Sequence, residues 1–426
     1  MVKYLIGFIL IGAHQIVAAQ SIDKIINAKE VERIERTLSA DDMRGRKIFT
    51  PDIDKAADFI AAEFKKAGLQ PVANNSYFQE FSMQRSRFIS ASGKVNGKAL
   101  DENHIIGLTA QNELSVNTSS GYEKIQVGAN DTLTNLVNRL QAAGKNYVLA
   151  VDTAQRMQFD RLKRGRSPFT PKGNIVLLLT TEDLNTFDVQ FKQDAQQLPL
   201  KNVVGILPGK SKKSEYVIFS GHYDHLGVGK ANVAGDSIFN GANDDAAGIT
   251  AVIMLANYFA KQKNNERTLI FAAFTAEESG GFGSRYFSQQ FDPNLVMAMF
   301  NIEMIGTESK WGKNSAFITG YEKSDMGAIL EKNLQGSAFK FYPDPYPQQQ
   351  LFYRSDNATL ARLGVPAHTI STSKMDSEKY YHTQDDEIET LDMNNMAEII
   401  KAIAISSTSI VAGKDTPSRV DASQLR

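Results

Sequence analysis

The chain has 426 residues, 42% of them hydrophobic, and its 47 basic and 48 acidic residues give a formal net charge of −1. This length and composition suffice for a full hydrophobic core and allow two or three domains. A nearly neutral charge argues against a nucleic-acid partner, which normally requires a basic face. Cysteine is absent, so the chain has no disulfide and no thiolate ligand, and any metal ligands must be His, Asp or Glu.

The first residues, Met1 to Gln20, have the pattern of a secretory signal peptide. Lys3 precedes an apolar run through Ile11, and small residues precede Gln20. The apolar run is too short to span a bilayer, and the small residues predict cleavage near Ala19. No later stretch is long and apolar enough to be a membrane anchor. We therefore expect a soluble product, secreted or periplasmic.

Two amphipathic helices are predicted next. Apolar residues recur at helical spacing from Ile22 to Leu38 and from Ile53 to Gly68, where the glycine is a typical C-terminal stop. A strand follows from Phe78 to Met83. Helices with one apolar face are expected to pack on a sheet.

The composition and periodicity of the sequence change between residues 85 and 200. Periodicity weakens, Asn, Ser, Thr and Gln are frequent, and short β-like runs occur at Tyr147–Val151 and Asn174–Thr180. The segment has no motif-like cluster of His, Asp and Glu, and His104 stands alone. We interpret residues 85–200 as an inserted, mostly β domain that covers or shapes an active site built from residues 20–84 and 201–413.

After the insertion, predicted strands and helices alternate. Strands are expected at 202–209, 216–219, 268–274, 296–302, 316–319 and 367–370, and helices at 246–263, 284–291, 324–334 and 394–411. This alternation predicts an α/β fold in which helices sandwich a mostly parallel sheet. Residues 414–426 are polar and are expected to form a flexible tail.

Polar side chains gather where these strands are predicted to end. They are His222, Asp224 and His225 after one strand, Asp244 and Asp245 before a helix, Glu277, Glu278 and Glu303 after two further strands, and His382 in a late loop. Ligand sites of open α/β sheets lie at the carboxyl ends of the strands. Imidazole and carboxylate groups that converge there favour a metal site.

These motifs resemble the zinc-dependent exopeptidases of the M28 family, the aminopeptidase and glutamate-carboxypeptidase-like group. In the family's order they are Gly-His-x-Asp at 221–224, Gly-Ala-x-Asp-Asp-Ala-x-Gly at 241–248, Ala-Glu-Glu-x-Gly at 276–280, Asn-x-acid-Met-x-Gly at 301–306 and Tyr-His-Thr at 381–383. Residues 42–46 and 62–69 resemble the family's opening. The insertion is similar in position to the protease-associated insert of some members.

The resemblance implies two zinc ions bridged by Asp244. His222 and Glu303 would complete one zinc site, and Glu278 and His382 the other, with Glu277 as general base. It also implies a zinc-exopeptidase-like fold and a cis peptide bond between residues 244 and 245.

The chemistry of these residue types agrees with a dizinc site. Three carboxylates and a hydroxide nearly neutralise two zinc ions, which acidify a bridging water when they lie roughly 3.5 to 4 Å apart. Asp224 is expected to orient the His222 imidazole, whereas His225 is expected to be a neighbour rather than a ligand. Tyr381 either donates to the developing oxyanion or only packs.

Two positions depart from the family pattern. Glu303 stands where the family usually has Asp, so the metal spacing or the occupancy of one site could differ. Asn357, in Ser355-Asp356-Asn357, replaces a histidine near the substrate pocket. Specificity is therefore not carried over from members that have this histidine.

Together these features predict a secreted dizinc metallopeptidase that removes N-terminal residues from peptides. A carboxypeptidase needs arginines for the substrate carboxylate, and Arg354 has no arginine cluster around it. The alternatives are a carboxypeptidase, a glutaminyl-cyclase-like enzyme with one zinc, and an inactive binding module. Metal stoichiometry distinguishes the cyclase, and turnover of amino-acid anilides distinguishes the binding module. Nitrogen and oxygen ligands also accept cobalt or manganese in place of zinc.

Overall fold

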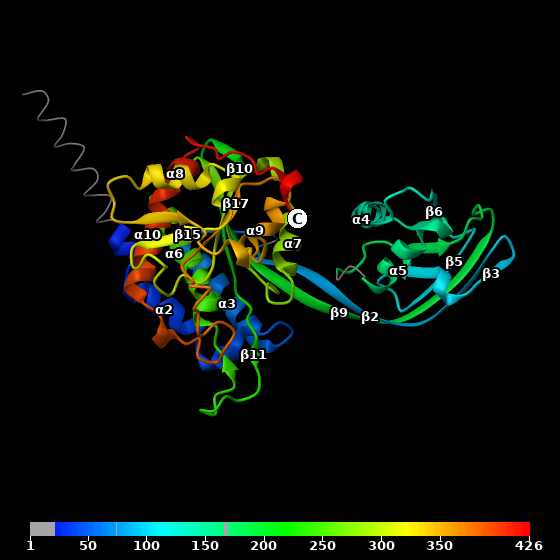
Figure 1. Ribbon diagram of the computed structural model, residues 1–426, viewed down its shortest axis with the longest axis horizontal. Helices are drawn as coiled ribbons and strands as arrows, with labels where there is room; N and C mark the ends of the chain where they lie inside the picture. Colours follow the sequence, from blue (N-terminus) through cyan, green and yellow to red (C-terminus); the bar gives the residue numbers. More distant parts are fainter. Residues whose placement is uncertain (1–21, 74, 166–168) are drawn as a thin grey trace, which may run out of the picture. The chain divides into compact units, whose positions relative to one another are not determined.

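The computed structural model describes residues 22–73, 75–165 and 169–426 (Figure 1). The chain divides into two compact units. The main unit ends its first part at Glu80 and resumes at Leu200, and the inserted unit spans Phe81–Pro199. The predicted signal peptide, with its cleavage site near Ala19, lies outside the described residues.

The main unit is built on a mixed, largely parallel sheet with the order β16-β15-β17-β14-β10-β13-β9, and β1 pairs with β9. The strands are β1 Gln70–Pro71, β9 Phe187–Leu207, β10 Lys212–His222, β13 Arg267–Phe274, β14 Val296–Ile302, β15 Ser315–Ile318, β16 Lys340–Pro343 and β17 Ala367–Ser371. The four central strands, β13, β10, β14 and β17, are parallel, and β9 is antiparallel to β13. The predicted mostly parallel α/β sheet is confirmed.

The central strands are buried on both faces. In β10, Val217 and Phe219 belong to the core on one face and Ile218 to the core on the other. Successive side chains of a strand point to opposite faces, so a strand covered on both sides needs an unbroken apolar run. This requirement explains why the run around residue 218 has no polar alternation.

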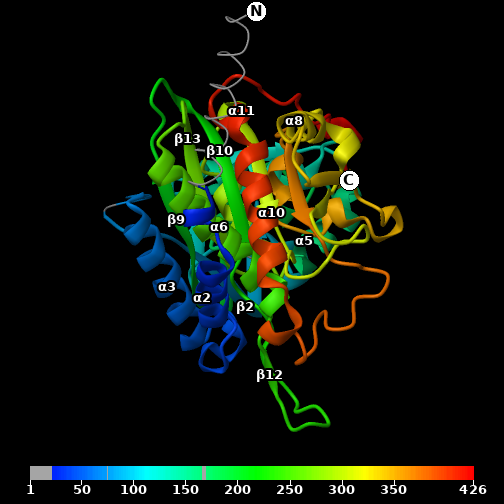
Figure 2. The same ribbon diagram turned by 90° about the vertical axis from the view of Figure 1, so that its left-hand side faces the viewer.

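Helices cover both faces of the sheet. Figure 2 shows α2, α3, α6 and α10 in front of β9, β10 and β13, whereas α7 and α9 pack with the core of the opposite face. The helices of this unit are α2 Ala28–Leu38, α3 Pro51–Ala67, α6 Ala247–Gln262, α7 Phe282–Ser288, α8 Met326–Asn333, α9 Asn357–Ala361, α10 Met393–Ser406 and α11 Thr408–Val411. None of the helices in the described ranges is long and apolar enough to cross a membrane.

Local sequence sets both ends of α3, which begins two residues before the predicted Ile53 and stops at Gly68 as predicted. Pro51 occupies the first turn, where its missing N–H costs nothing. Gly68 ends the helix in the left-handed region with φ of 83°. By contrast, α6 is apolar around most of its circumference and is buried along most of its length, so it is the central helix of its layer.

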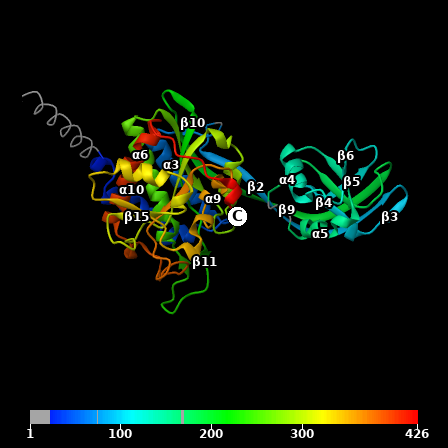
Figure 3. The ribbon, with the colours of Figure 1, turned by 45° about the horizontal axis from the view of Figure 1, so that its top comes forward.

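The inserted unit has a four-stranded sheet of order β4-β8-β7-β6 with two helices (Figure 3). Its elements are β2 Phe78–Val95, β3 Lys98–Leu100, β4 Ile105–Leu108, β5 Glu113–Asn117, β6 Glu123–Val127, α4 Leu133–Ala143, β7 Tyr147–Val151, α5 Arg156–Arg164 and β8 Ile175–Leu179, with part of β9. One sheet face packs on α4 and α5, and the other packs on β5 and β9. The two helices were not predicted.

Residues 414–426 were expected to form a flexible tail, but they lie against the main unit. The buried Arg267 donates to the carbonyl oxygen of Asp415 at 2.8 Å. Arg419 donates to the carbonyl oxygen of Val296 at 2.8 Å, and Val420 is 4% exposed. The polar composition of the segment concealed these backbone contacts, which satisfy donors of distant residues.

Candidate metal centre

The end of β10 places His222 with its Nε2 atom free. Its Nδ1 lies 3.1 Å from the backbone carbonyl oxygen of Asp224, which fixes the ring and leaves Nε2 as a lone-pair donor. The Asp224 carboxylate, expected to orient this imidazole, is 3.9 Å from Nδ1. It instead accepts a hydrogen bond from the backbone N–H of Glu277 at 3.0 Å. Asp224 therefore holds the Glu277 segment, and only its backbone orients the imidazole.

Asp244 lies between two imidazoles at the junction that leads into α6. Its Oδ1 is 3.2 Å from His222 Nε2, and its Oδ2 is 3.2 Å from His382 Nε2. The peptide bond between residues 244 and 245 is cis, as the resemblance implied. Each carboxylate oxygen thus faces a different histidine.

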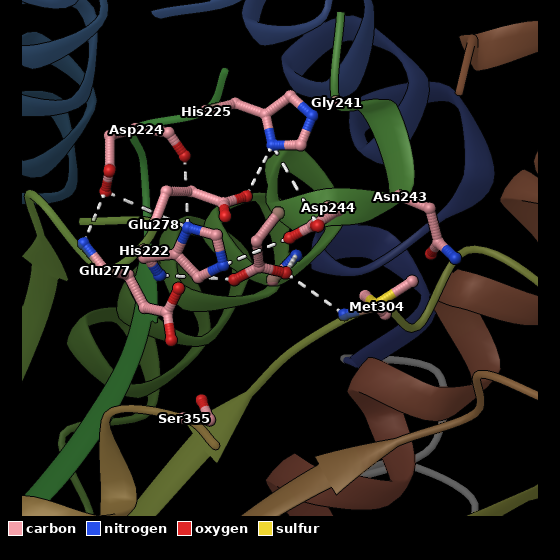
Figure 4. A network of polar contacts seen from close by, with 12 residues as sticks. His222, Asp224, His225, Gly241, Asn243, Asp244, Glu277, Glu278, Met304 and Ser355 are labelled. Carbon is pink, nitrogen blue, oxygen red and sulfur yellow. Dashed lines mark hydrogen bonds and ion pairs between the residues drawn. The ribbon is translucent and has the colours of Figure 1, made fainter. Parts of the chain in front are cut away.

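The loop after β13 presents Glu277 and Glu278 to different surroundings. Glu278 Oε2 lies 3.2 Å from His382 Nε2, and its Oε1 lies 2.9 Å from His225 Nδ1 (Figure 4). Burial acts to raise the pKa of Glu278, but hydrogen bonds from the two histidines lower it to about 2. Burial raises the pKa of Glu277 well above its usual range.

Glu303 follows β14 and joins His222 and Asp244 in one group whose potential ligand atoms all lie within 4.8 Å of one another. A second group of this kind contains His225, Asp244 and Glu278. The sequence-predicted ligands, including His382 through its two contacts, are therefore brought together around Asp244.

A small pocket with a volume of about 40 Å³ adjoins this cluster. It shares Glu303 with the cluster and is also lined by Tyr381, Arg354 and apolar side chains that include Met304 and Phe317. The Tyr381 ring stacks on His382 with centroids 3.9 Å apart, and burial raises the pKa of its hydroxyl. Tyr381 is therefore protonated at neutral pH and available as a hydrogen-bond donor at the pocket.

Buried charged residues outside the predicted set hold the ligand-bearing segments. Asp245 accepts from the backbone N–H of His222 at 3.2 Å and of Met304 at 3.1 Å, so it ties the segment of one predicted ligand to that of another. Asp386 accepts from the backbone N–H of Asp244 at 3.0 Å. The sequence places Asp245 in the predicted polar cluster without giving it a role, whereas Asp386 has no sequence signal of its own.

Arg46 is a further residue that sequence reasoning did not assign to the site. Its fully buried guanidinium donates to the carbonyl oxygens of Leu38, Tyr223, Asn240 and Gly241 at 2.6 to 2.9 Å. It thereby links the loop after β10 to the loop that precedes Asp244.

The spacing of the predicted ligands fits metal coordination. Tetrahedral zinc with bonds of about 2.0 to 2.1 Å holds neighbouring ligand atoms roughly 3.3 Å apart. The three pairs formed among His222, Asp244, Glu278 and His382 are each separated by 3.2 Å. Within the described chain, Nε2 of His222, Nε2 of His382 and Oε2 of Glu303 are buried without a hydrogen-bond partner, so these atoms suit ligation of a cation.

The model of Peptidase family M28 matches residues 202–406, the part of the chain that contains all five predicted ligands. This part of the chain belongs to peptidase family M28. A probable leucine aminopeptidase of Trichophyton verrucosum is 26% identical to it over 214 residues, which are 48% of this chain and 56% of that protein. The chain spans about half the length of the curated relatives that it matches first.

Solved structures show how the M28 fold extends over the chain. BSAP, a zinc aminopeptidase from Bacillus subtilis, is similar with a TM-score of 0.52 and 16% identity, covering 93% of this chain and 98% of BSAP. A glutaminyl cyclase from Porphyromonas gingivalis is similar with a TM-score of 0.51 and 13% identity, covering 91% and 99%. The fold of this chain is thus shared by proteins with different named activities.

Proposed function

We propose that this M28 protein is a dizinc aminopeptidase that hydrolyses the first peptide bond of its substrates. The observation that carries the proposal is the pair of 3.2 Å contacts from the two oxygens of Asp244 to His222 and His382. A carboxylate that faces two unpartnered imidazole nitrogens from its two oxygens suits a bridge between two cations. Glu303 and Glu278 then supply one further carboxylate on each side.

Bound zinc ions would acidify a water molecule and polarise the carbonyl of the scissile bond. Glu277 takes one proton from the water as its oxygen adds to the carbonyl carbon. Glu277 then delivers this proton to the leaving amine when the carbon–nitrogen bond breaks. The hydrogen bond from its backbone to Asp224 fixes the segment that carries it. Tyr381 donates a hydrogen bond toward the carbonyl oxygen as negative charge develops there.

The choice of an aminopeptidase is supported by the relatives named leucine aminopeptidases and by the acidic character of the cluster, which suits a free α-amino group. A carboxypeptidase is the second candidate because Arg354 lines the pocket next to Tyr381. Arg354 is exposed and donates a hydrogen bond to Gln349 at 3.4 Å. One arginine of this kind is a weaker anchor than the clustered arginines that a substrate carboxylate favours.

The test is metal content per chain combined with turnover of dipeptides that carry free or blocked N-termini. We expect about two zinc ions and cleavage of the free-amine substrates only. Preference for N-blocked peptides with a free carboxylate would replace the proposal with a carboxypeptidase. One zinc ion together with release of cyclised N-terminal glutamine would replace it with a cyclase, and absence of turnover with zinc bound would indicate a binding module.

A further inference from the structure

His225 is an imidazole beside the metal centre that the mechanism above does not use. Its side chain is fully buried. Its Nδ1 lies 2.9 Å from Glu278 Oε1, the oxygen of that carboxylate that does not face His382. One oxygen of Glu278 therefore contacts His225 (Figure 4), and the other contacts His382.

The surroundings of the ring select one tautomer of His225. Nε2 is buried and has no hydrogen-bond partner among the described residues. A proton on Nε2 would leave a buried donor unsatisfied, and it would also place the Nδ1 lone pair against a carboxylate oxygen. Both costs disappear when the proton is on Nδ1, because Nδ1 then donates to Glu278.

The distances distinguish this role from that of a ligand. His382 Nε2 is 3.2 Å from both Asp244 and Glu278, the separation that two atoms on one metal adopt. His225 Nδ1 is 4.0 Å from Asp244 and is at hydrogen-bond distance from Glu278 alone. The geometry of His225 is that of a donor to a ligand.

We propose that His225 is a positioning residue that donates its Nδ1 proton to Glu278 Oε1 and so directs Oε2 toward His382 and Asp244. The inference rests on the proposed dizinc centre. The hydrogen bond would keep Glu278 bound through one oxygen, and it would set the affinity of the zinc site that Glu278 and His382 form. Hydrogen bonds of this kind to ligands contribute about 10- to 100-fold to metal affinity.

The backbone around His225 is shaped to hold the ring in this place. A Cβ atom on Gly241 would lie 2.5 Å from His225 Cδ2, so a side chain there would displace the imidazole. The N–H of His225 donates to the carbonyl oxygen of Arg46 at 3.3 Å. Arg46 in turn donates to the carbonyl oxygen of Gly241. The two segments that flank the imidazole, at Arg46 and at Gly241, are therefore hydrogen-bonded to each other.

The test compares His225→Asn, His225→Gln and His225→Ala by zinc titration of the metal-free full-length protein. An Asn amide places its N–H close to the position of Nδ1, whereas a Gln amide places it near that of Nε2. We call the site of Glu278 and His382 the second zinc site and that of His222 and Glu303 the first. We expect the Asn variant to bind zinc at the second site within a few-fold of wild type. The Ala and Gln variants should bind zinc there about 10- to 100-fold more weakly, with affinity at the first site unchanged.

The matched control is His368→Asn, which removes another buried imidazole of the main unit. Nδ1 of His368 lies 2.8 Å from the Thr319 carbonyl oxygen and Nε2 lies 2.7 Å from Ser324, so this variant should lose stability and keep both zinc affinities. Equal zinc affinities in wild type and His225→Ala would overturn the inference. Weaker binding at the second site in the Asn variant, together with a changed cobalt(II) absorption spectrum, would also overturn it, because this result would make His225 a ligand. Failure of wild type to bind two zinc ions would instead remove the dizinc proposal.

Discussion

Glu277 and Glu278 are adjacent in the chain, yet the structure gives them opposite electrostatic surroundings. Histidines on both sides lower the pKa of Glu278 to about 2 despite its burial, so it is an anion at neutral pH. For Glu277, burial raises the pKa well above its usual range, although the nearby His222 acts to lower it. The first property suits a ligand and the second suits a group that accepts and returns a proton.

Replacing Glu277 by Gln should leave both zinc ions bound and lower kcat by roughly 10²- to 10⁴-fold, because the amide cannot accept the proton of the water. The measurement is kcat on a free-amine dipeptide together with zinc content per chain. Turnover close to that of wild type would exclude Glu277 as the general base. Loss of zinc from the variant would show that this side chain serves as a ligand.

At the scale of elements, the site depends on loops that long-range hydrogen bonds hold together. Arg46 is the last residue of a short 3-10 helix, Asp41–Arg46, between α2 and α3. Its guanidinium contacts four carbonyl oxygens from three parts of the chain. Asp386 holds the Asp244 backbone from the loop that carries His382. The ligands therefore come from separate elements but are fixed by a shared polar network.

Arg46→Ala should destabilise the protein by roughly 3 to 5 kcal/mol, because it leaves several buried carbonyl oxygens without a donor. The free energy of unfolding by urea measures this loss. Arg36→Ala is the control, since Arg36 is an exposed side chain of α2 that pairs with Glu32, and we expect little change from it. Equal effects of the two variants would show that the Arg46 hydrogen bonds contribute no net stability.

Glu35 of α2 gives a pH dependence that belongs to the packing of α2 on α6. Burial raises its pKa to about 8, although the Thr250 hydroxyl donates to it at 2.8 Å. Between about pH 4.3, its ordinary value, and pH 8, the unfolded chain loses this proton and the folded chain keeps it. The stability contributed by Glu35 therefore falls as the pH rises through this range.

Glu35→Gln should remove this part of the pH dependence. The free energy of unfolding of the variant relative to wild type should increase from pH 5 to pH 8.5, because only the wild type has a group to ionise there. Glu32→Gln, at a partly exposed position of the same helix, is the control and should follow wild type. A constant difference between Glu35→Gln and wild type across this range would contradict the raised pKa.

At the scale of the whole molecule, we propose that the protein is exported and that its signal peptide is removed after Ala19. The pattern of residues 1–20 supports this proposal. The absence of cysteine means that the exported protein needs no disulfide to fold. Cell fractionation and intact mass should find a mature chain that begins at Gln20 outside the cytoplasm. A cytoplasmic chain that retains Met1 would contradict the proposal.

Much of the main unit could be predicted because its signals are local. The apolar run around Phe219 identifies a strand buried on both faces, and the helical spacing that ends at Gly68 gives both the helix and its stop. In the inserted unit, Leu133, Val137 and Leu140 of α4 recur at helical spacing, although no helix was predicted there. The five-residue α9 and four-residue β16 are too short for a periodic signal.

The sequence by itself determined the order of the motifs and the identity of the groups that gather at the strand ends, because parallel strands bring residues at their carboxyl ends to one edge. Only the tertiary structure decided how these groups divide their roles. In the structure, the Asp224 carboxylate accepts a hydrogen bond from the Glu277 backbone, the Asp386 carboxylate accepts one from the Asp244 backbone, and the His225 imidazole contacts Glu278. These contacts join residues 53 to 142 positions apart, and such pairings follow from the packing of whole elements rather than from any local pattern.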